Sequence, residues 1–282
     1  MKDKQTKEEV LIEALPYIQT YEGKTFVIKY GGAAMTDERL KETFAKDVTI
    51  LRKIGVNIII VHGGGKEITE LASALQIPTR FVDGQRYTDQ EMIKIVLMTL
   101  AGKLNKEIVN LINANGGNAI GLCGVDNQLL KAQRSTDKDL GLVGEVSAVN
   151  TSFLNLLLTN GMMPVIAPLA VGEEGKILNI NADLAAGAIA SALRAEKLVY
   201  LSDIEGVMVD QKLVSTLTHA EAGSLIERGA IHGGMIPKIN SAFDTLHAGV
   251  NKVHIIDGRM KHSLLLEIFT DEGIGTQMIH ES

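Results

Sequence analysis

Residues 25–32 are TFVIKYGG and residues 57–65 are NIIIVHGGG, and in both stretches a short apolar run leads directly into glycine. A near-continuous apolar run of this length is typical of a central parallel strand, because helices cover both of its faces. A glycine turn after such a strand leaves backbone amides free to face an anion. Ligands of open α/β sheets lie beyond the carboxyl ends of the strands, so we expect both loops to border one site.

Further strands and helices alternate along the rest of the chain. Apolar runs predict strands over 163–167, 198–201 and 252–256. Helical patterns lie between the strands, over 7–21, 37–53, 66–75, 89–114, 152–160, 182–194, 219–228, 236–247 and 262–269. Capping boxes are predicted at Thr6–Glu9, Thr88–Glu91 and Thr218–Glu221. This alternation predicts an α/β fold, a three-layer αβα sandwich around a mostly parallel central sheet. The polar segment 123–150 is interpreted as hairpins that project from the sheet and could serve as a lid.

Composition excludes several classes of protein. Lys and Arg number 28 against 34 Asp and Glu, a net charge of −6, which disfavours a nucleic-acid binder. The single cysteine, Cys123, cannot form an intrachain disulfide, which fits a reducing compartment. No run reaches the roughly 18 apolar residues needed to cross a membrane. We therefore expect a cytoplasmic protein without a membrane partner.

Several polar residues stand at positions that are not explained by packing in a hydrophobic core. Arg86 precedes a predicted helix, and Asn179 and Asn181 alternate along an extended segment, so both face one side. Asp183 follows at the start of the 182–194 helix, where a carboxylate is also favoured simply by the helix dipole. Lys238 lies at another helix start, where a cation is unfavourable unless an anion compensates it.

This set of residues suits phosphoryl transfer, which depends on positioning and charge stabilisation. Lysines can neutralise the moving group, glycine amides can hold its oxygens, and an arginine can bind a carboxylate through two hydrogen bonds. Neither glycine loop matches the P-loop pattern or G-x-G-x-x-G. The histidines show no metal-ligand spacing, so no resident metal site is predicted.

The chain carries six motifs in a specific order: VIKYGGAAM (27–35), IIIVHGGGKEI (58–68), DGQRYTD (83–89), LNINADLAA (178–186), YLSDIEGV (200–207) and GGMIPKINSA (233–242). Together they resemble the amino-acid kinase family, and within it the arginine-inhibited N-acetylglutamate kinases. The resemblance implies the amino-acid kinase fold and transfer of the ATP γ-phosphate to the side-chain carboxylate of N-acetyl-L-glutamate, a step of arginine biosynthesis. It also implies that Mg²⁺ enters with ATP.

The same resemblance assigns roles to residues. Lys29 and Lys238 correspond to the two lysines that stabilise the transition state, and Asp183 to the carboxylate that orients them. The positions implied for the acceptor are Gly64, Gly65, Arg86, Asn179 and Asn181. Those implied for phosphate and nucleotide are Gly32, Gly63, Asp203, Gly206 and His232.

The two ends of the chain resemble the arginine-inhibited members in particular. There the extra N-terminal helix interlaces between dimers and builds a hexamer, a trimer of dimers; alternatively, helix 7–21 could pack on its own core. Candidate contacts to inhibitory L-arginine are Tyr17, Lys197, His262, Glu267 and Gly275. The implied organisation is an interaction helix (1–22), an acceptor-binding and dimerisation lobe (23–194), and an ATP-binding and regulatory lobe (195–282).

Two alternatives remain open at this point. A related kinase of the same family could act on another acceptor, such as glutamate, aspartate, carbamate or UMP. A catalytically silent, arginine-sensing protein could also use this fold, although it would be free to lose Lys29, Asp183 and Lys238.

Overall fold

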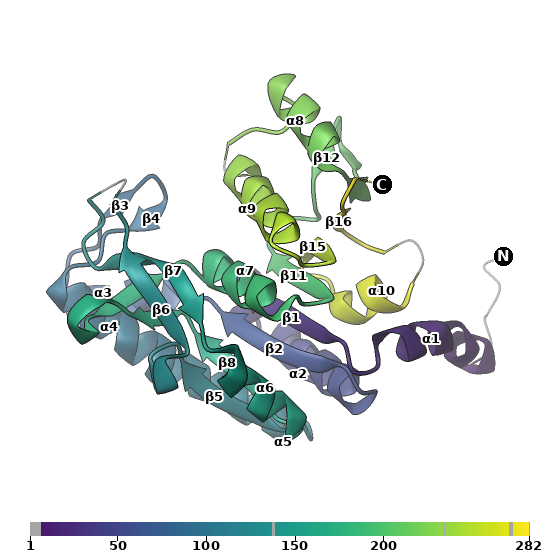
Figure 1. Cartoon of the computed structure of the whole chain (residues 1–282), viewed down its shortest axis with the longest axis horizontal. Coiled ribbons are helices and arrows are strands. Elements are labelled where there is room, and N and C mark those ends of the chain that lie inside the picture. The colour runs from purple at the N-terminus through teal and green to yellow at the C-terminus, as the bar shows by residue number, and fades with distance from the viewer. Residues whose placement is uncertain (1–6, 137–138, 234, 271–272, 282) are drawn as a thin grey trace.

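One eight-stranded sheet runs through the protein, as the computed structural model shows (Figure 1). The structure describes residues 7–136, 139–233, 235–270 and 273–281, and before residue 14 the only described side chain is that of Ile12. From one edge to the other the strands are β14 (Thr216–Leu217), β16 (Thr276–Met278), β15 (Lys252–Asp257), β11 (Lys197–Ser202), β1 (Thr25–Tyr30), β2 (Asn57–His62), β8 (Met163–Ala167) and β5 (Ala119–Cys123). Most pairs are parallel, and β15–β16 is antiparallel, which confirms the predicted sheet.

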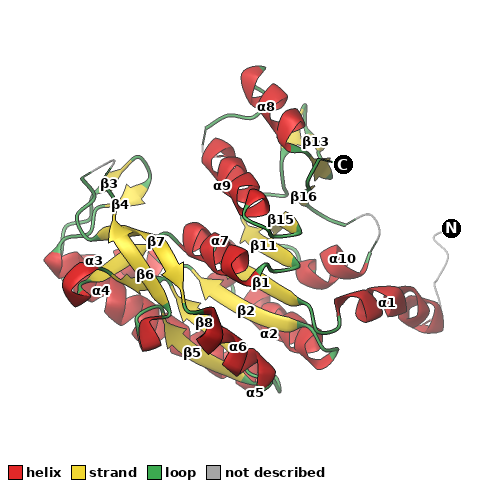
Figure 2. Cartoon of the chain, in the orientation of Figure 1, coloured by secondary structure: helices red, strands yellow, loops and turns green. Residues whose placement is uncertain are grey.

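Helices cover both faces of this sheet (Figure 2). One face carries α2 (Glu38–Lys53), α3 (Gly65–Ala74), α4 (Gln90–Leu97), α5 (Asn105–Ala114) and α10 (Ser263–Phe269). The other carries α6 (Thr151–Thr159), α7 (Ala182–Leu193), α8 (His219–Glu227) and α9 (Met235–His247). A hydrophobic core lies on each face of the sheet, and strand β1 contributes to both. Val27 faces the α7 side, whereas Phe26 and Ile28 face the α2 side. The three-layer αβα prediction is therefore confirmed.

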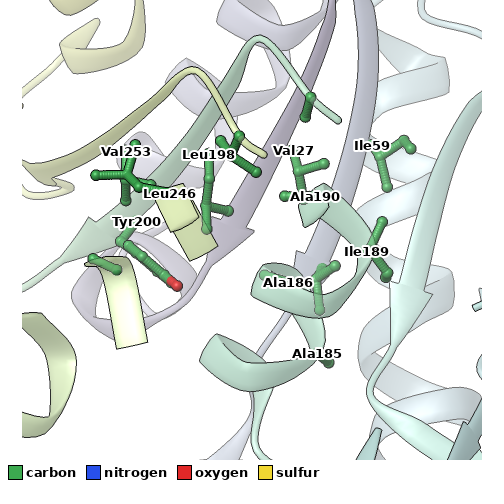
Figure 3. Packing of buried hydrophobic residues seen from close by; sticks show 14 of the residues in the cluster. Val27, Ile59, Ala185, Ala186, Ile189, Ala190, Leu198, Tyr200, Leu246 and Val253 are labelled. Atoms are coloured by element: carbon green, nitrogen blue, oxygen red, sulfur yellow. The ribbon is translucent and has the colours of Figure 1, made fainter. Parts of the chain in front are cut away.

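Helix α7 packs closely on the sheet because its inner face is made of small residues (Figure 3). Ala186 and Ala190 are fully buried against Val27 of β1 and Leu198 of β11. Removing apolar surface of this kind from water stabilises a fold by about 25 cal/mol per Å². The close approach also brings the first turn of α7, with Asp183, near the carboxyl end of β1.

The polar segment 123–150 contains the predicted hairpin, formed by β6 (Leu130–Arg134) and β7 (Val143–Val149). The hairpin does not stand alone, because β9 (Leu169–Val171) and β10 (Ile177–Ile180) join it in a small closed barrel. Short hairpins also pair β3 (Phe81–Val82) with β4 (Gln85–Arg86), and β12 (Met208–Val209) with β13 (Lys212–Leu213). Strands of two to four residues are too short for periodicity to reveal.

Two local predictions are corrected by the structure. The 89–114 helix is interrupted by a π-helical segment, η2 (Met98–Leu104), which separates α4 from α5. The capping box at Thr88 is wrong: Asp89 caps α4 by accepting from the amides of Glu91 and Met92, while the Thr88 hydroxyl donates to the carbonyl of Arg86. The box at Thr218 is confirmed, and Thr6 lies outside the described residues.

Helix α1 (Lys7–Tyr21) lies at the periphery, beside α10 (Figure 1). Its last turns hold it there, because the Tyr17 ring meets Phe269 edge-on and the Tyr21 ring meets Phe26. Its earlier part leaves apolar side chains in solvent, with Ile12 69% and Leu15 50% exposed. Within the described part of the chain, no helix has the length and apolar character that crossing a membrane requires.

Candidate active site

Two lysines flank one carboxylate at the centre of the molecule. Lys29 Nζ, at the end of β1, lies 3.0 Å from Asp183 Oδ1, and Lys238 Nζ, from the first turn of α9, lies 3.7 Å from Asp183 Oδ2. The Lys238 ammonium also lies 3.5 Å from the Ser202 hydroxyl. Residues separated by more than 200 positions in the sequence thus form one cluster of two lysines and a carboxylate.

The electrostatics of this cluster fix its charges. Burial alone would raise the pKa of Asp183, but the neighbouring Lys29 and Lys238 outweigh it and hold the pKa below its usual value. Burial lowers the pKa of Lys238, and the Asp183 carboxylate opposes that shift. The Asp183 carboxylate therefore favours the charged form of Lys238, and its ion pairs hold both lysine side chains in place.

The two glycine loops lie side by side, as their positions after β1 and β2 predicted. The Gly63 amide donates to the Tyr30 carbonyl at 2.8 Å, which joins the second loop to the end of β1. Gly32 has φ +67°, and a Cβ there would collide with the Asp203 carboxylate, so this position requires glycine. Asp203 Oδ1 in turn accepts a hydrogen bond from the amide of Ala33 at 2.6 Å.

Arg86 is the principal cation on the acceptor side. Its Nη2 donates to the Gly65 carbonyl and to the Thr69 hydroxyl, both at 2.8 Å, and its guanidinium stacks on Phe81 at 4.8 Å from the ring centroid. Nη1 is buried and has no protein partner among the described residues. The guanidinium therefore keeps an unused donor available for a ligand carboxylate.

The two predicted asparagines have different local roles. Asn179, on β10, donates to the Thr88 hydroxyl at 3.1 Å. Asn181 caps α7, since its Oδ1 accepts from the amides of Asp183 and Leu184. Local helix capping therefore accounts for Asn181, although its side chain still borders the same cavity as Asn179.

A single cavity of ≈ 320 Å³ brings most of these residues together. The predicted site residues that line it are Lys29, Gly32, Gly63, Gly64, Gly65, Arg86, Asn179, Asn181 and Asp183. A second cavity adjoins the carboxyl end of β11 and is lined by Asp203, Gly206 and His232, the residues expected at the nucleotide. Asp203 belongs to the second cavity and touches the Gly31–Gly32 loop of the first, so it joins the two.

A third cavity opens between α1, α10 and the sheet edge. It is lined by four of the five residues expected to contact arginine: Tyr17, Lys197, Glu267 and Gly275. His262 lies elsewhere: its Nδ1 is 2.7 Å from Asp47 Oδ1, and it borders a smaller, separate cavity.

The histidine of this third cavity is His254, which sequence reasoning missed. Its Nδ1 lies 2.6 Å from Glu267 Oε1, and Glu267 Oε2 accepts from the amides of Ile274 and Gly275. His254 stands within strand β15, where it was counted as part of an apolar run. The pairing of β15 with β11 places His254 opposite Val199, two residues from Lys197. A predicted neighbourhood of these two strands could therefore have pointed to His254.

No group of three or more His, Cys, Asp or Glu side chains among the described residues is arranged to hold a metal ion.

Comparisons with known proteins agree with this geometry. Residues 24–257 match the model of the amino acid kinase family. An acetylglutamate kinase of Chlorobaculum tepidum is 56% identical over 273 residues, 96% of each chain. One from Campylobacter fetus is 49% identical over 269 residues, 95% of this chain and 96% of its own.

Solved structures share the architecture. An N-acetylglutamate synthase from Neisseria gonorrhoeae, complexed with coenzyme A and N-acetyl-glutamate, superposes with a TM-score of 0.87 at 28% identity. The match covers 99% of this chain but 64% of the synthase, so this protein spans about two thirds of that one. A Giardia lamblia carbamate kinase, at 16% identity and a TM-score of 0.65, shares the fold alone. Because the family model matches residues 24–257, most of the chain, the protein belongs to the amino acid kinase family.

Proposed function

We propose that this protein transfers the γ-phosphate of ATP to the side-chain carboxylate of N-acetyl-L-glutamate, an early reaction of arginine biosynthesis. The observation that carries the proposal is the Lys29–Asp183–Lys238 cluster. Lys29 and Asp183 line the cavity that also contains both glycine loops and Arg86, and Lys238 approaches Asp183 from α9 without lining that cavity itself. The acetylglutamate kinases that match nearly the whole chain support the choice of acceptor.

In this reaction a side-chain carboxylate oxygen of the acceptor forms a bond to the γ-phosphorus. The bond from that phosphorus to the β–γ bridging oxygen breaks, and ADP leaves with the electron pair. The acceptor carboxyl is ionised at neutral pH, so no general base is needed. Lys29 and Lys238 supply positive charge where it is needed most, on the oxygens of the moving group.

The acceptor binds through its other polar groups. Arg86 and Asn179 are suited to hold the α-carboxylate and the acetamido group, because a guanidinium and an amide offer directed donors. Gly64 and Gly65 line the same cavity, so their amides are suited to bind the reacting end of the acceptor. ATP occupies the second cavity, near Gly206 and His232.

We include Mg²⁺ as the partner of ATP, because this ion binds mainly through nucleotide phosphates and one or two carboxylates. Asp203, an oxygen donor between the two cavities, is the carboxylate that fits this role. Mg²⁺ held there would neutralise charge on the phosphate chain.

The test is ADP formation, with hydroxylamine trapping of the acyl phosphate, for N-acetylglutamate, glutamate and aspartate in parallel. We expect turnover with N-acetylglutamate to be at least about 100-fold more efficient than with glutamate or aspartate, because the proposed site hydrogen-bonds an acetamido group that the free amino acids lack. Equal turnover with glutamate or aspartate would favour a related kinase. No turnover with any acceptor, together with arginine binding, would favour a regulatory protein.

We further propose that L-arginine inhibits the enzyme from the third cavity. An amino acid with a guanidinium matches the chemistry of that cavity, which is lined by the carboxylate of Glu267 and the side-chain amine of Lys197. The proposed division assigns the acceptor to residues 23–194, and ATP and arginine to residues 195–282. Residues 1–22 act between subunits of a hexamer in the cytoplasm, and the exposed Ile12 and Leu15 of α1 form the contact.

This regulatory proposal has its own test. The double variant Ile12→Ser/Leu15→Ser should reduce the wild-type mass from hexamer to dimer in light scattering and weaken arginine inhibition, with acetylglutamate turnover retained. The control is Leu75→Ser, which removes a 52%-exposed apolar residue at the C-cap of α3 instead. A double variant of unchanged mass and unchanged arginine sensitivity would contradict the role given to α1.

A further inference from the structure

A buried polar pair lies beneath the Gly63–Gly65 loop, and the proposed function gives it no role. His62 ends β2 and Asn105 begins α5, and the two side chains are 0% and 1% exposed. Neither side chain borders the cavity. Buried polar groups of this kind are costly unless they are fully hydrogen-bonded, so their partners indicate their purpose.

The two ring nitrogens of His62 have fixed and different roles. Nδ1 lies 2.9 Å from the Gly63 carbonyl oxygen, which can only accept, so Nδ1 carries the hydrogen. Nε2 lies 3.3 Å from Asn105 Nδ2 and is therefore the acceptor. Burial lowers the pKa of His62 to about 4, which agrees with the neutral imidazole that these contacts require.

Asn105 is itself held in one orientation. Its Nδ2 faces the carbonyls of Val165 on β8, at 2.9 Å, and of Leu122 on β5, at 3.2 Å. Its Oδ1 accepts from Lys106 Nζ at 3.0 Å. The amide therefore ties the imidazole to two neighbouring strands of the rigid sheet.

The π-helical segment η2, directly before Asn105, secures the loop from the other side. Leu100 and Leu104 occupy the space beside Gly64, where an added Cβ would lie 2.6 Å from Leu100 Cδ2. π-helical turns are rare and are frequent at functional sites. The π-helical segment and the residue that follows it thus place apolar side chains, Leu100 and Leu104, beside the loop and the Asn105 amide beneath it.

These contacts fix how the loop presents its amides. The peptide plane between Gly63 and Gly64 is rigid, so holding the Gly63 carbonyl toward His62 turns the Gly64 N–H the opposite way. Among the described residues, the N–H groups of Gly64 and Gly65 have no protein partner. They are available to a ligand, in an orientation that the loop's own glycines could not maintain.

We propose that His62, braced by Asn105, is a positioning residue for the phosphoryl transfer, because it aims the Gly64 amide at the reacting oxygens. The inference rests on the proposed function, in which the glycine amides stabilise the transferring group. A preorganised donor contributes to catalysis because it needs no reorientation when charge develops.

Two variants separate the hydrogen bond to the loop from simple filling of space. His62→Asn places an amide nitrogen where Nδ1 stands and keeps the donor to the Gly63 carbonyl. His62→Gln reaches to the position of Nε2, keeps a partner for Asn105 and loses that donor. We expect His62→Gln to lose about 30-fold or more in kcat, as for a misplaced oxyanion donor, with KM for ATP changed less than threefold. His62→Asn should recover most of that loss.

Hydrogen exchange of the peptide that contains residues 58–68 gives a second readout, independent of turnover. Exchange should be faster in His62→Gln than in His62→Asn or the wild type, at matched thermal stability. Equal exchange, or kcat losses that are equal in both variants and follow their stabilities, would overturn the proposal. If the wild type shows no acetylglutamate turnover but the exchange difference persists, the proposed function fails, and of the inference only the hydrogen bond by which His62 holds the Gly63–Gly65 loop stands.

Discussion

Replacing the central carboxylate tests the site most directly. Asp183→Asn keeps the shape of the side chain and removes the negative charge between Lys29 and Lys238. At an effective dielectric constant of about 20, the charge pairs at 3.0 Å and 3.7 Å are worth at most about 5.5 and about 4.5 kcal/mol. The carboxylate is 26% exposed, so solvent screening reduces both figures.

We expect a loss of about 10²–10³-fold in kcat/KM, equivalent to about 2.7–4 kcal/mol, carried mostly by kcat. The physical reason is that two unpaired lysines repel each other and leave the positions that the transition state requires. Without the carboxylate the pKa of Lys238 falls further, so the alkaline decline of kcat should move to lower pH.

The assay is steady-state ADP release between pH 6 and 9, with thermal unfolding measured alongside. Asp244→Asn, on the exposed side of α9, is the matched control and should match the wild type. Adding Lys29→Met to Asp183→Asn should cost little more than the single change, because residues that act as a unit are not additive. A kcat/KM within threefold of wild type in Asp183→Asn would refute the reasoning.

Three further outcomes are expected. Arg86→Lys keeps the positive charge but loses the guanidinium that donates to Gly65 and Thr69. The KM for acetylglutamate should therefore rise about 10–100-fold, while the KM for ATP stays within threefold. Equal rises in both KM values would contradict the assignment of Arg86 to the acceptor. Burial lowers the pKa of Lys197 to about 8, so the side chain should lose its positive charge as the pH rises from 7 to 9. Arginine inhibition should weaken over the same range. In Lys197→Arg, whose guanidinium stays charged, inhibition should stay constant over this pH range. Thr218→Ala removes a capping box and should lower the free energy of unfolding by about 1 kcal/mol in urea titrations, with unchanged kcat as the check that α8 acts only on stability.

The sequence was most informative where the local pattern and the tertiary environment agree. The bounds of β1 and β8 were predicted to the residue, because an apolar run of five or six residues between turn signals has few other solutions. The glycine loops followed from the same runs, and the motifs supplied Lys29, Asp183 and Lys238.

The sequence was least informative where a residue's role depends on partners from other elements. β5 escaped prediction because AIGLC is short and contains glycine, and only pairing with β8 makes it a strand. His262 and His254 are eight positions apart, but only the tertiary structure turns one toward Asp47 and the other toward Glu267.

What the sequence determined by itself is the layered α/β fold and the residues that carry charge and flexibility at the carboxyl ends of the strands. The tertiary structure decided which of those residues meet. Lys29 and Lys238 come within reach of the Asp183 carboxylate because α7 packs closely on β1 and β11. That close packing is possible because the buried residues of α7 are small. The orientation of the Gly63–Gly65 loop was likewise decided by His62 and Asn105, because hydrogen bonds between distant segments exist only once the chain has folded.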